Sequence, residues 1–127
     1  MNLDNITALL SVVATKHEID QKRDWSAGSS TYFEALKNEI EEVGEELNAD
    51  RKCYLEDELG DVFWDYLNLL YNLDAEGKIS LPKVFERALG KYQERIDTIS
   101  NGGTWASVKQ KQKLKLASEL KASKIST

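Results

Sequence analysis

The sequence predicts an all-α protein, and two observations support this. One proline and seven glycines in 127 residues leave long stretches without a helix breaker. Apolar residues recur along these stretches at steps of three and four, the spacing of one helix face. The length is that of one domain, so we expect residues 1–127 to form a single domain of about five helices.

The first expected helix runs from Leu3 to Asp20. Its apolar positions at helical spacing are Ile6, Leu9, Leu10 and Val13. The only histidine, His17, lies beside this face and is expected to be a structural or surface residue rather than a ligand. A glycine and a serine cluster then interrupt the pattern, which predicts a loop over residues 22–30 that carries Trp25.

The second expected helix runs from Thr31 to Asn48, and Thr31 with Glu34 resembles a capping box at its start. Its apolar stripe consists of Phe33, Leu36, Ile40, Val43 and Leu47. The opposite side carries Asn38, Glu41, Glu42 and Glu45. In an isolated chain this pattern indicates a solvated acidic face. A metal site there requires another helix or a partner subunit to cover that face.

The third expected helix runs from Arg51 to Asn72. Its apolar arc consists of Leu55, Leu59, Val62, Phe63, Tyr66, Leu67 and Leu70. Beside this arc lie Glu58, Asp61 and Asp65, at positions i, i+3 and i+7. Carboxylates that border a core are partly desolvated, so they favour a neighbouring cation.

The fourth expected helix begins near Ser80 and Pro82 and ends near Ile96, before a Ser-Asn-Gly-Gly turn. Thr104 is positioned to cap a fifth, Lys-rich helix. Its lysines are Lys109, Lys111, Lys113, Lys115, Lys121 and Lys124. Such a run usually forms a solvated helix face, and the alternative is that it contacts a phosphate or an acidic neighbouring subunit.

Charge and cysteine content restrict the class of protein. The net charge is −5, which argues against duplex nucleic acid as the main partner because phosphate binding depends on basic patches. A lone cysteine, Cys53, excludes an intrachain disulfide framework and a Cys-rich zinc site. The short apolar run at the start is interrupted by Asp4 and is far below membrane-spanning length. We therefore expect a cytoplasmic protein with no membrane partner.

Two pairs of acids are the strongest functional signal. Glu42 and Glu45 form one i,i+3 pair, and Glu58 and Asp61 form another on the next helix. If these helices pack antiparallel, four carboxylates can converge, and such hard oxygen ligands suit a divalent cation such as Mg²⁺. Spacing alone leaves open the alternative of two solvated acidic faces.

Two runs of residues resemble the signature of MazG-type nucleoside triphosphate pyrophosphohydrolases. They are residues 40–49 (Ile-Glu-Glu-Val-Gly-Glu-Glu-Leu-Asn-Ala) and residues 58–64 (Glu-Leu-Gly-Asp-Val-Phe-Trp). Less specific similarities are Trp25, the run Lys91-Tyr92 with Arg95, and Trp105 with Val108-Lys109. The resemblance implies a MazG-like helical bundle whose core is completed by subunit pairing, in a homodimer or a dimer-of-dimers tetramer.

The resemblance also implies a chemistry. Glu42, Glu45, Glu58 and Asp61 would hold Mg²⁺, or alternatively Mn²⁺, against the triphosphate. Water, assisted by Glu41 or Glu42, would attack the α-phosphorus and release a nucleoside monophosphate and pyrophosphate. Lys91 and Arg95 would contact phosphate oxygens, although a solvated helix face is an equal alternative for them. Trp25 would stack on the base, whereas Trp64 is favoured as a core or interface aromatic.

Departures from the family pattern leave the substrate open. Ala88-Leu89-Gly90 precede Lys91 where family members often carry Asn, and Ser26-Ala27-Gly28 replace a charged, Gln-containing run after Trp25. We expect a role in removing noncanonical or excess nucleotides. The alternatives are phosphoribosyl-ATP or dUTP pyrophosphohydrolase chemistry, and an inactive helical oligomerisation module.

Overall fold

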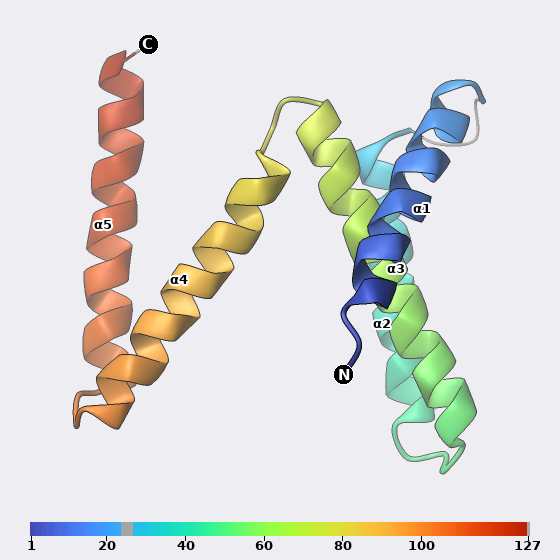
Figure 1. The fold of residues 1–127 in the computed structure, drawn as a ribbon, viewed down its shortest axis with the longest axis horizontal. Coiled ribbons are helices and arrows are strands. Elements are labelled where there is room, and N and C mark those ends of the chain that lie inside the picture. Colours follow the sequence, from blue (N-terminus) through green and yellow to red (C-terminus); the bar gives the residue numbers. More distant parts are fainter. Residues whose placement is uncertain (24–26, 127) are drawn as a thin grey trace. The chain divides into compact units, whose positions relative to one another are not determined.

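The computed structural model describes residues 1–23 and 27–126, and it contains five helices and no strand in these ranges (Figure 1). They are α1 (Asp4–Gln21), α2 (Ser29–Glu46), α3 (Lys52–Ala75), α4 (Leu81–Ser100) and α5 (Trp105–Ser126). The predicted all-α fold is thus confirmed. No helix in the described ranges is long and apolar enough to cross a bilayer.

The chain divides into two compact units, residues 1–81 and 82–127. The first holds α1, α2 and α3, and the second holds α5 with nearly all of α4. The single domain expected over residues 1–127 stays a prediction.

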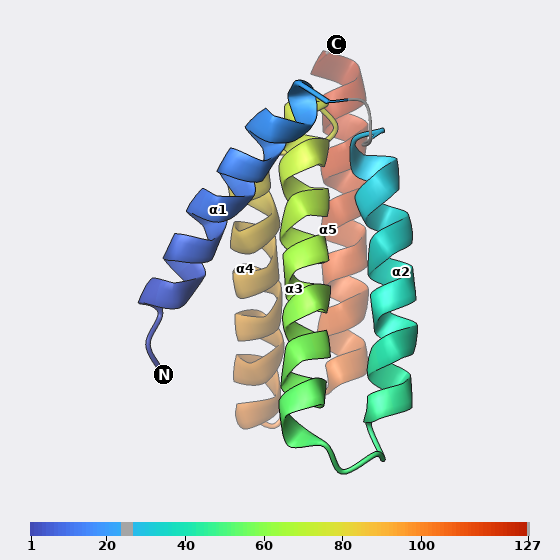
Figure 2. The same cartoon turned by 90° about the vertical axis from the view of Figure 1, so that its right-hand side faces the viewer.

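In the first unit, α2 and α3 lie alongside one another in antiparallel directions, and α1 crosses α3 at an angle (Figure 2). A buried polar cluster ties α1 to α2. The hydroxyl of Tyr32 donates to the carboxylate of Asp20, and the ammonium of Lys16 contacts both groups. Burial and the Asp20 carboxylate raise the pKa of Tyr32, so its hydroxyl keeps its proton and remains a donor.

The start of α2 differs from the predicted capping box. Thr31 lies inside the helix, where its Oγ1 accepts a hydrogen bond from the Ala27 backbone at 2.7 Å. The cap comes instead from Glu76 just beyond α3, whose carboxylate accepts from the backbone N–H and hydroxyl of Ser29, both at 2.8 Å. Gly28 has φ of +81°, and a Cβ there would lie 2.7 Å from a Glu76 oxygen. A distant carboxylate therefore replaces the local cap.

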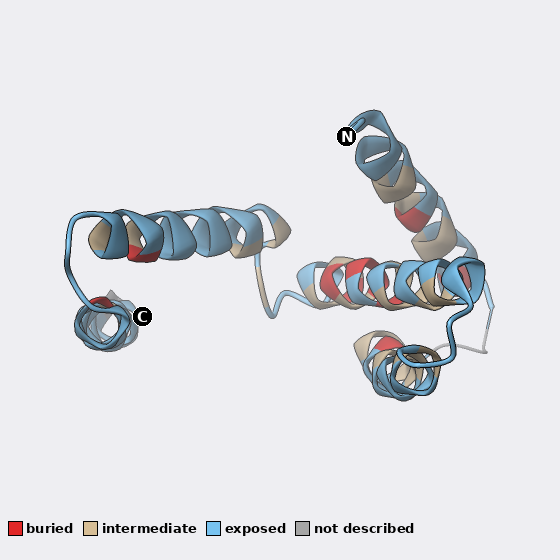
Figure 3. Ribbon diagram, turned by 90° about the horizontal axis from the view of Figure 1, so that it is seen from below, coloured by how far each residue is buried: buried red, intermediate tan, exposed pale blue. Residues whose placement is uncertain are grey.

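The hydrophobic core is small (Figure 3). The buried apolar side chains in the described ranges are Val13, Tyr32, Leu67, Leu70 and Val108. Three members of the α2 stripe that the sequence places on a core face, Phe33, Ile40 and Leu47, are more than half exposed. Leu36 and Val43 of the same stripe are half-buried. On α3, the apolar arc is likewise split, with Leu59, Phe63 and Tyr66 exposed. Periodicity identified these apolar faces but not which part of each face meets a neighbour.

In the second unit, α4 and α5 form a helical hairpin. As predicted, Thr104 caps α5, accepting a hydrogen bond from the Ser107 backbone at 3.1 Å. The fourth helix ends at Ser100 rather than near Ile96. The Gly103 N–H closes its end by donating to the Thr98 carbonyl at 2.8 Å, and a Cβ on Gly103 would lie 3.0 Å from that oxygen. This close approach accounts for glycine in the turn.

Candidate metal centre

Acidic side chains from α2 and α3 converge at one point of the first unit. Glu39, Glu58 and Asp61 each offer a carboxylate oxygen, and these oxygens all lie within 4.8 Å of one another. The antiparallel arrangement of α2 and α3 brings Glu39 opposite two acids that are one turn apart on α3. Ligands of one divalent ion lie about 2.0–2.6 Å from the metal, so this spacing fits a shared cation.

Two oxygens of this group have no hydrogen-bond donor among the described residues. Glu39 Oε2 and Glu58 Oε2 are both buried and unpartnered in the described part of the chain, because their neighbours are other carboxyl groups. Carboxylate oxygens in such a position are satisfied either by a shared proton or by a cation. The donor set therefore fits a hard divalent cation such as Mg²⁺ or Mn²⁺.

The pKa values of the group show the electrostatic cost of the convergence. Burial, with the adjacent carboxyl groups of Glu42 and Glu58, raises the pKa of Glu39 to about 7. Burial and neighbouring carboxyl groups, including that of Glu42, also raise the pKa of Glu58 and of Asp61. A bound cation would reverse this effect by favouring the charged forms.

The converging acids agree with the prediction on α3 and differ from it on α2. Glu58 and Asp61 converge, and Glu42 lies close enough to act on Glu39 and Glu58. Glu45 is exposed and is not in the converging group, and Glu41 is also exposed. Glu39 takes part instead, and sequence reasoning missed it. The available signal was its i−3 position from Glu42, which continues the same series by one turn.

Of the predicted substrate-binding residues, Lys91 and Arg95 belong to the second unit. Trp25 falls outside the described residues. Lys91 is exposed on α4, with its ammonium 5.7 Å from the centre of the Tyr92 ring. Arg95 is buried in the second unit, where its Nε donates to Gln112 Oε1 at 2.8 Å. Of these two basic residues, Lys91 is therefore a solvent-exposed cation and Arg95 is not.

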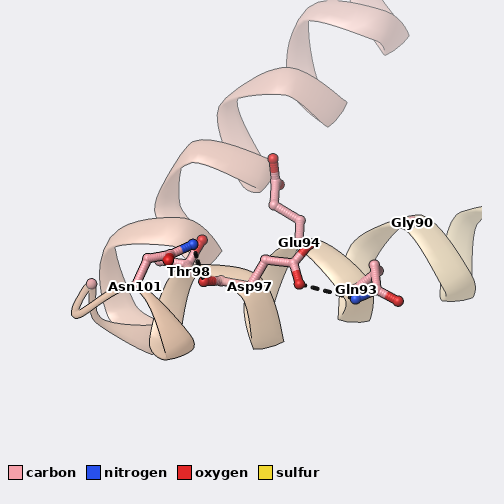
Figure 4. Close-up of a pocket in the computed structure, with 7 residues that line it drawn as sticks. Gly90, Gln93, Glu94, Asp97, Thr98 and Asn101 are labelled. Atoms are coloured by element: carbon pink, nitrogen blue, oxygen red, sulfur yellow. Dashed lines mark hydrogen bonds between the residues drawn. The ribbon is translucent and has the colours of Figure 1, made fainter.

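The second unit has a shallow hollow on α4 and the turn that follows it, which differs in chemistry from the acidic group (Figure 4). Gln93 donates to the Asp97 carboxylate across one helical turn, and Asn101 donates to the Asp97 carbonyl, both at 3.0 Å. The lining residues include the carboxylates Glu94 and Asp97 and no lysine or arginine. This hollow offers no positive charge to a phosphate and no converging carboxylates to a metal.

We expect the acidic group to make the stability of the metal-free protein depend on pH. Because the folded chain raises the pKa of Glu39 to about 7, it binds a proton more tightly than the unfolded chain does, where Glu titrates near pH 4.3. The stabilisation is present below about pH 4.3 and is lost as the pH rises through about 7. In EDTA, the thermal unfolding midpoint of the wild type should therefore fall as the pH rises from about 4.3 to about 7. The midpoint of the Glu39→Gln variant should fall less over the same pH range. Parallel pH curves for the two proteins would contradict this assignment.

One comparison with known proteins identifies the family of this chain. A family model described as the MazG nucleotide pyrophosphohydrolase domain matches residues 27–100. This range is more than half of the chain and includes all of α2, α3 and α4, and therefore the acidic group. Comparisons with curated proteins and with solved structures found no match. The chain belongs to the MazG nucleotide pyrophosphohydrolase family.

Proposed function

We propose that this protein is a Mg²⁺-dependent nucleoside triphosphate pyrophosphohydrolase. Its products would be a nucleoside or deoxynucleoside monophosphate and pyrophosphate. The observation that carries this proposal is the convergence of Glu39, Glu58 and Asp61 oxygens within 4.8 Å, in a chain whose family is that of nucleotide pyrophosphohydrolases. Removal of noncanonical or excess nucleotides is the role we infer for it.

The residues of the site would have distinct tasks. Glu58 and Asp61 from α3 would hold the cation, with Glu39 or Glu42 completing the ligand set from α2, and Glu45 as the further predicted ligand. When bound, Mg²⁺ neutralises phosphate oxygens and makes water a better nucleophile.

The proton of the attacking water needs an acceptor that lies near the cation. Of the two acids predicted to accept it, Glu41 and Glu42, we assign Glu42 because it lies beside Glu39 and Glu58. Attack at the α-phosphorus breaks the bond between that phosphorus and the oxygen bridging it to the β-phosphorus, and pyrophosphate leaves. We further infer that Lys91 and Arg95 contact phosphate oxygens and that Trp25 stacks on the base.

An assay of pyrophosphate release over a panel of ribo- and deoxynucleoside triphosphates, dUTP and phosphoribosyl-ATP tests the proposal. We expect turnover of at least one nucleoside triphosphate in Mg²⁺ or Mn²⁺ and none in EDTA. Selective turnover of phosphoribosyl-ATP or dUTP would instead support the related chemistries. If no compound is cleaved with either metal, the chain is an inactive member of its family and the proposal is wrong.

We also propose that the protein is a homodimer or a pair of such dimers. Five apolar residues on α4 are exposed and follow one another at steps of four, three, four and three: Phe85, Leu89, Tyr92, Ile96 and Ile99. This is the heptad spacing of a helix that packs against another helix. In a two-fold dimer the same stripe of both subunits would form the interface. The small core of the single chain supports the same conclusion, since a partner would cover this stripe.

Leu89→Lys should therefore dissociate the assembly. Leu89 is 71% exposed in the single chain, and a lysine there would place a charge in the middle of the apolar stripe on α4. Light scattering coupled to gel filtration should give the wild type at least twice the chain mass of 14.4 kDa, and the variant about that mass. Leu114→Lys, at a position 61% exposed on α5, is the matched control and should stay assembled. A monomeric wild type, or equal dissociation of both variants, would rule out the apolar stripe on α4 as the interface between subunits.

A further inference from the structure

The charge of the chain is divided unevenly between its two units. Residues 1–81 contain 18 acids and 7 lysines or arginines, whereas residues 82–127 contain 4 acids and 10 lysines or arginines. The net charge is therefore −11 in the first unit and +6 in the second. Such a chain is electrostatically complementary to a second copy of itself, because the basic unit of each copy attracts the acidic unit of the other.

The basic charge of the second unit includes an exposed row along α5. Five exposed residues follow one another at steps of four, four, three and four: Lys109, Lys113, Ala117, Leu120 and Lys124. Lys111 lies outside this row and approaches the Glu94 carboxylate of α4 at 3.5 Å. Lys109 and Lys113 form no ion pair among the described residues. The start of the row is therefore open to an anionic partner.

The outward face of α2 is the acidic counterpart of this row. Its exposed residues Glu34, Asn38, Glu41 and Glu45 follow one another at steps of four, three and four. Glu41 and Glu45 form no ion pair among the residues that the structure describes. They are four positions apart, as are Lys109 and Lys113, so each pair presents two charges one helical turn apart. Two such helices lying side by side can form two lysine–glutamate pairs.

We propose that the lysine row of α5 docks on the acidic face of α2 in a second copy of this chain. In a two-fold pair each copy gives its α5 and receives that of its partner, so both contacts form together. The docking rests on the homodimer proposed above, which the apolar stripe on α4 holds together. Exposed ion pairs are individually weak, so this contact strengthens the dimer without replacing the stripe.

Docking also brings positive charge toward the metal centre. Glu41 and Glu45 lie on either side of Glu42, whose carboxyl group acts on those of Glu39 and Glu58. Lysines from a partner would cover the face of α2 that is solvated in the single chain, and they would offset part of its negative charge. Because α5 lies outside the range matched by the family model, this cover is a feature of the chain's own C-terminal helix.

The salt dependence of the dimer tests the contact apart from metal binding and hydrolysis. Sedimentation equilibrium of the full chain in EDTA gives the dissociation constant. Raising NaCl from about 50 to about 500 mM should raise it at least about tenfold, because salt screens ion pairs between exposed side chains. An interface made by the apolar stripe on α4 alone would not weaken in this way. A dimer whose affinity does not fall with salt would overturn the docking.

Charge reversal identifies the two faces. The double variant Lys109→Glu and Lys113→Glu should weaken the dimer at low salt at least about tenfold, because glutamates then face glutamates. The double variant Glu41→Lys and Glu45→Lys should weaken it similarly, with lysines facing lysines. An equimolar mixture of the two variants should recover the wild-type affinity, since both contacts of the mixed dimer again join opposite charges. Unchanged affinity in both double variants would refute the docking.

The matched control makes the same change of charge away from α2. The double variant Glu18→Lys and Glu56→Lys alters exposed acids of α1 and α3, and it should keep the wild-type affinity. Mixed with the α5 variant, it should not restore the lost affinity. Restoration by this control as well would show a general charge effect and overturn the assigned faces.

Two outcomes separate this contact from other arrangements of the chain. If a chain with all four reversals recovers wild-type affinity while the mixture does not, α5 contacts α2 of its own chain and the second copy is the wrong occupant. A wild type that is monomeric at every salt concentration would overturn both this docking and the homodimer through α4. A dimer that is insensitive to salt and to charge reversal would overturn the docking alone.

Discussion

Replacing Asp61 by asparagine is expected to lower the rate of pyrophosphate release at least about 100-fold, since a lost metal interaction costs several kcal/mol in the transition state. The substitution keeps the size of the side chain and removes the charge that the cation requires. The oxygen of Asp61 lies within 4.8 Å of those of Glu39 and Glu58, so the whole ligand set is affected. Initial rates at saturating Mg²⁺ and calorimetric Mg²⁺ affinity should fall together.

The stability of the Asp61→Asn protein separates a lost ligand from a lost fold. Burial and nearby carboxylates raise the pKa of Asp61, so the charged form is disfavoured in the folded chain without metal. In EDTA at neutral pH, the variant should unfold at the same temperature as the wild type or higher. Glu56→Gln, which alters an exposed acid of the same helix outside the converging group, is the matched control. Full activity of Asp61→Asn would exclude a metal centre between α2 and α3.

Replacing Leu67 by alanine should have the largest effect on stability, about 2–5 kcal/mol. Leu67 is 1% exposed and is one of few buried apolar side chains in the first unit. Because that core is small, neighbouring side chains have little scope to fill the cavity. Urea unfolding followed by circular dichroism measures the loss.

The same deletion at an exposed leucine provides the comparison. Leu47 follows α2 and is 61% exposed, so Leu47→Ala should cost less than about 1 kcal/mol. Equal losses for the two variants would mean that the buried core of the first unit is not the one described.

The helices could be predicted from the sequence because their determinants are local. Apolar spacing and signals at the helix ends located all five, and the Thr104 cap was read correctly from its place before Trp105. Glu58 and Asp61 were predicted as neighbours because they are one turn apart on a single helix. Features such as these involve residues within a few positions of one another.

Where the sequence reasoning failed, the determining contact was distant in sequence. The cap of α2 comes from Glu76 rather than from Thr31, across 47 positions from Ser29. The participation of Glu39 depends on the relative placement of α2 and α3, which periodicity does not specify. The surroundings of Arg95 depend on Gln112, 17 positions later on another helix.

The sequence by itself determined the all-α fold, the positions of the helices and the acid pattern that led to the MazG family, because each follows from spacing along one helix. Only the tertiary structure decided which carboxylates converge and which apolar residues remain exposed. Those outcomes depend on how one helix is placed and rotated against its neighbour. Contacts between helices set that rotation, and they leave Phe33 and Ile40 exposed while bringing Glu39 to the acidic group with Glu58 and Asp61.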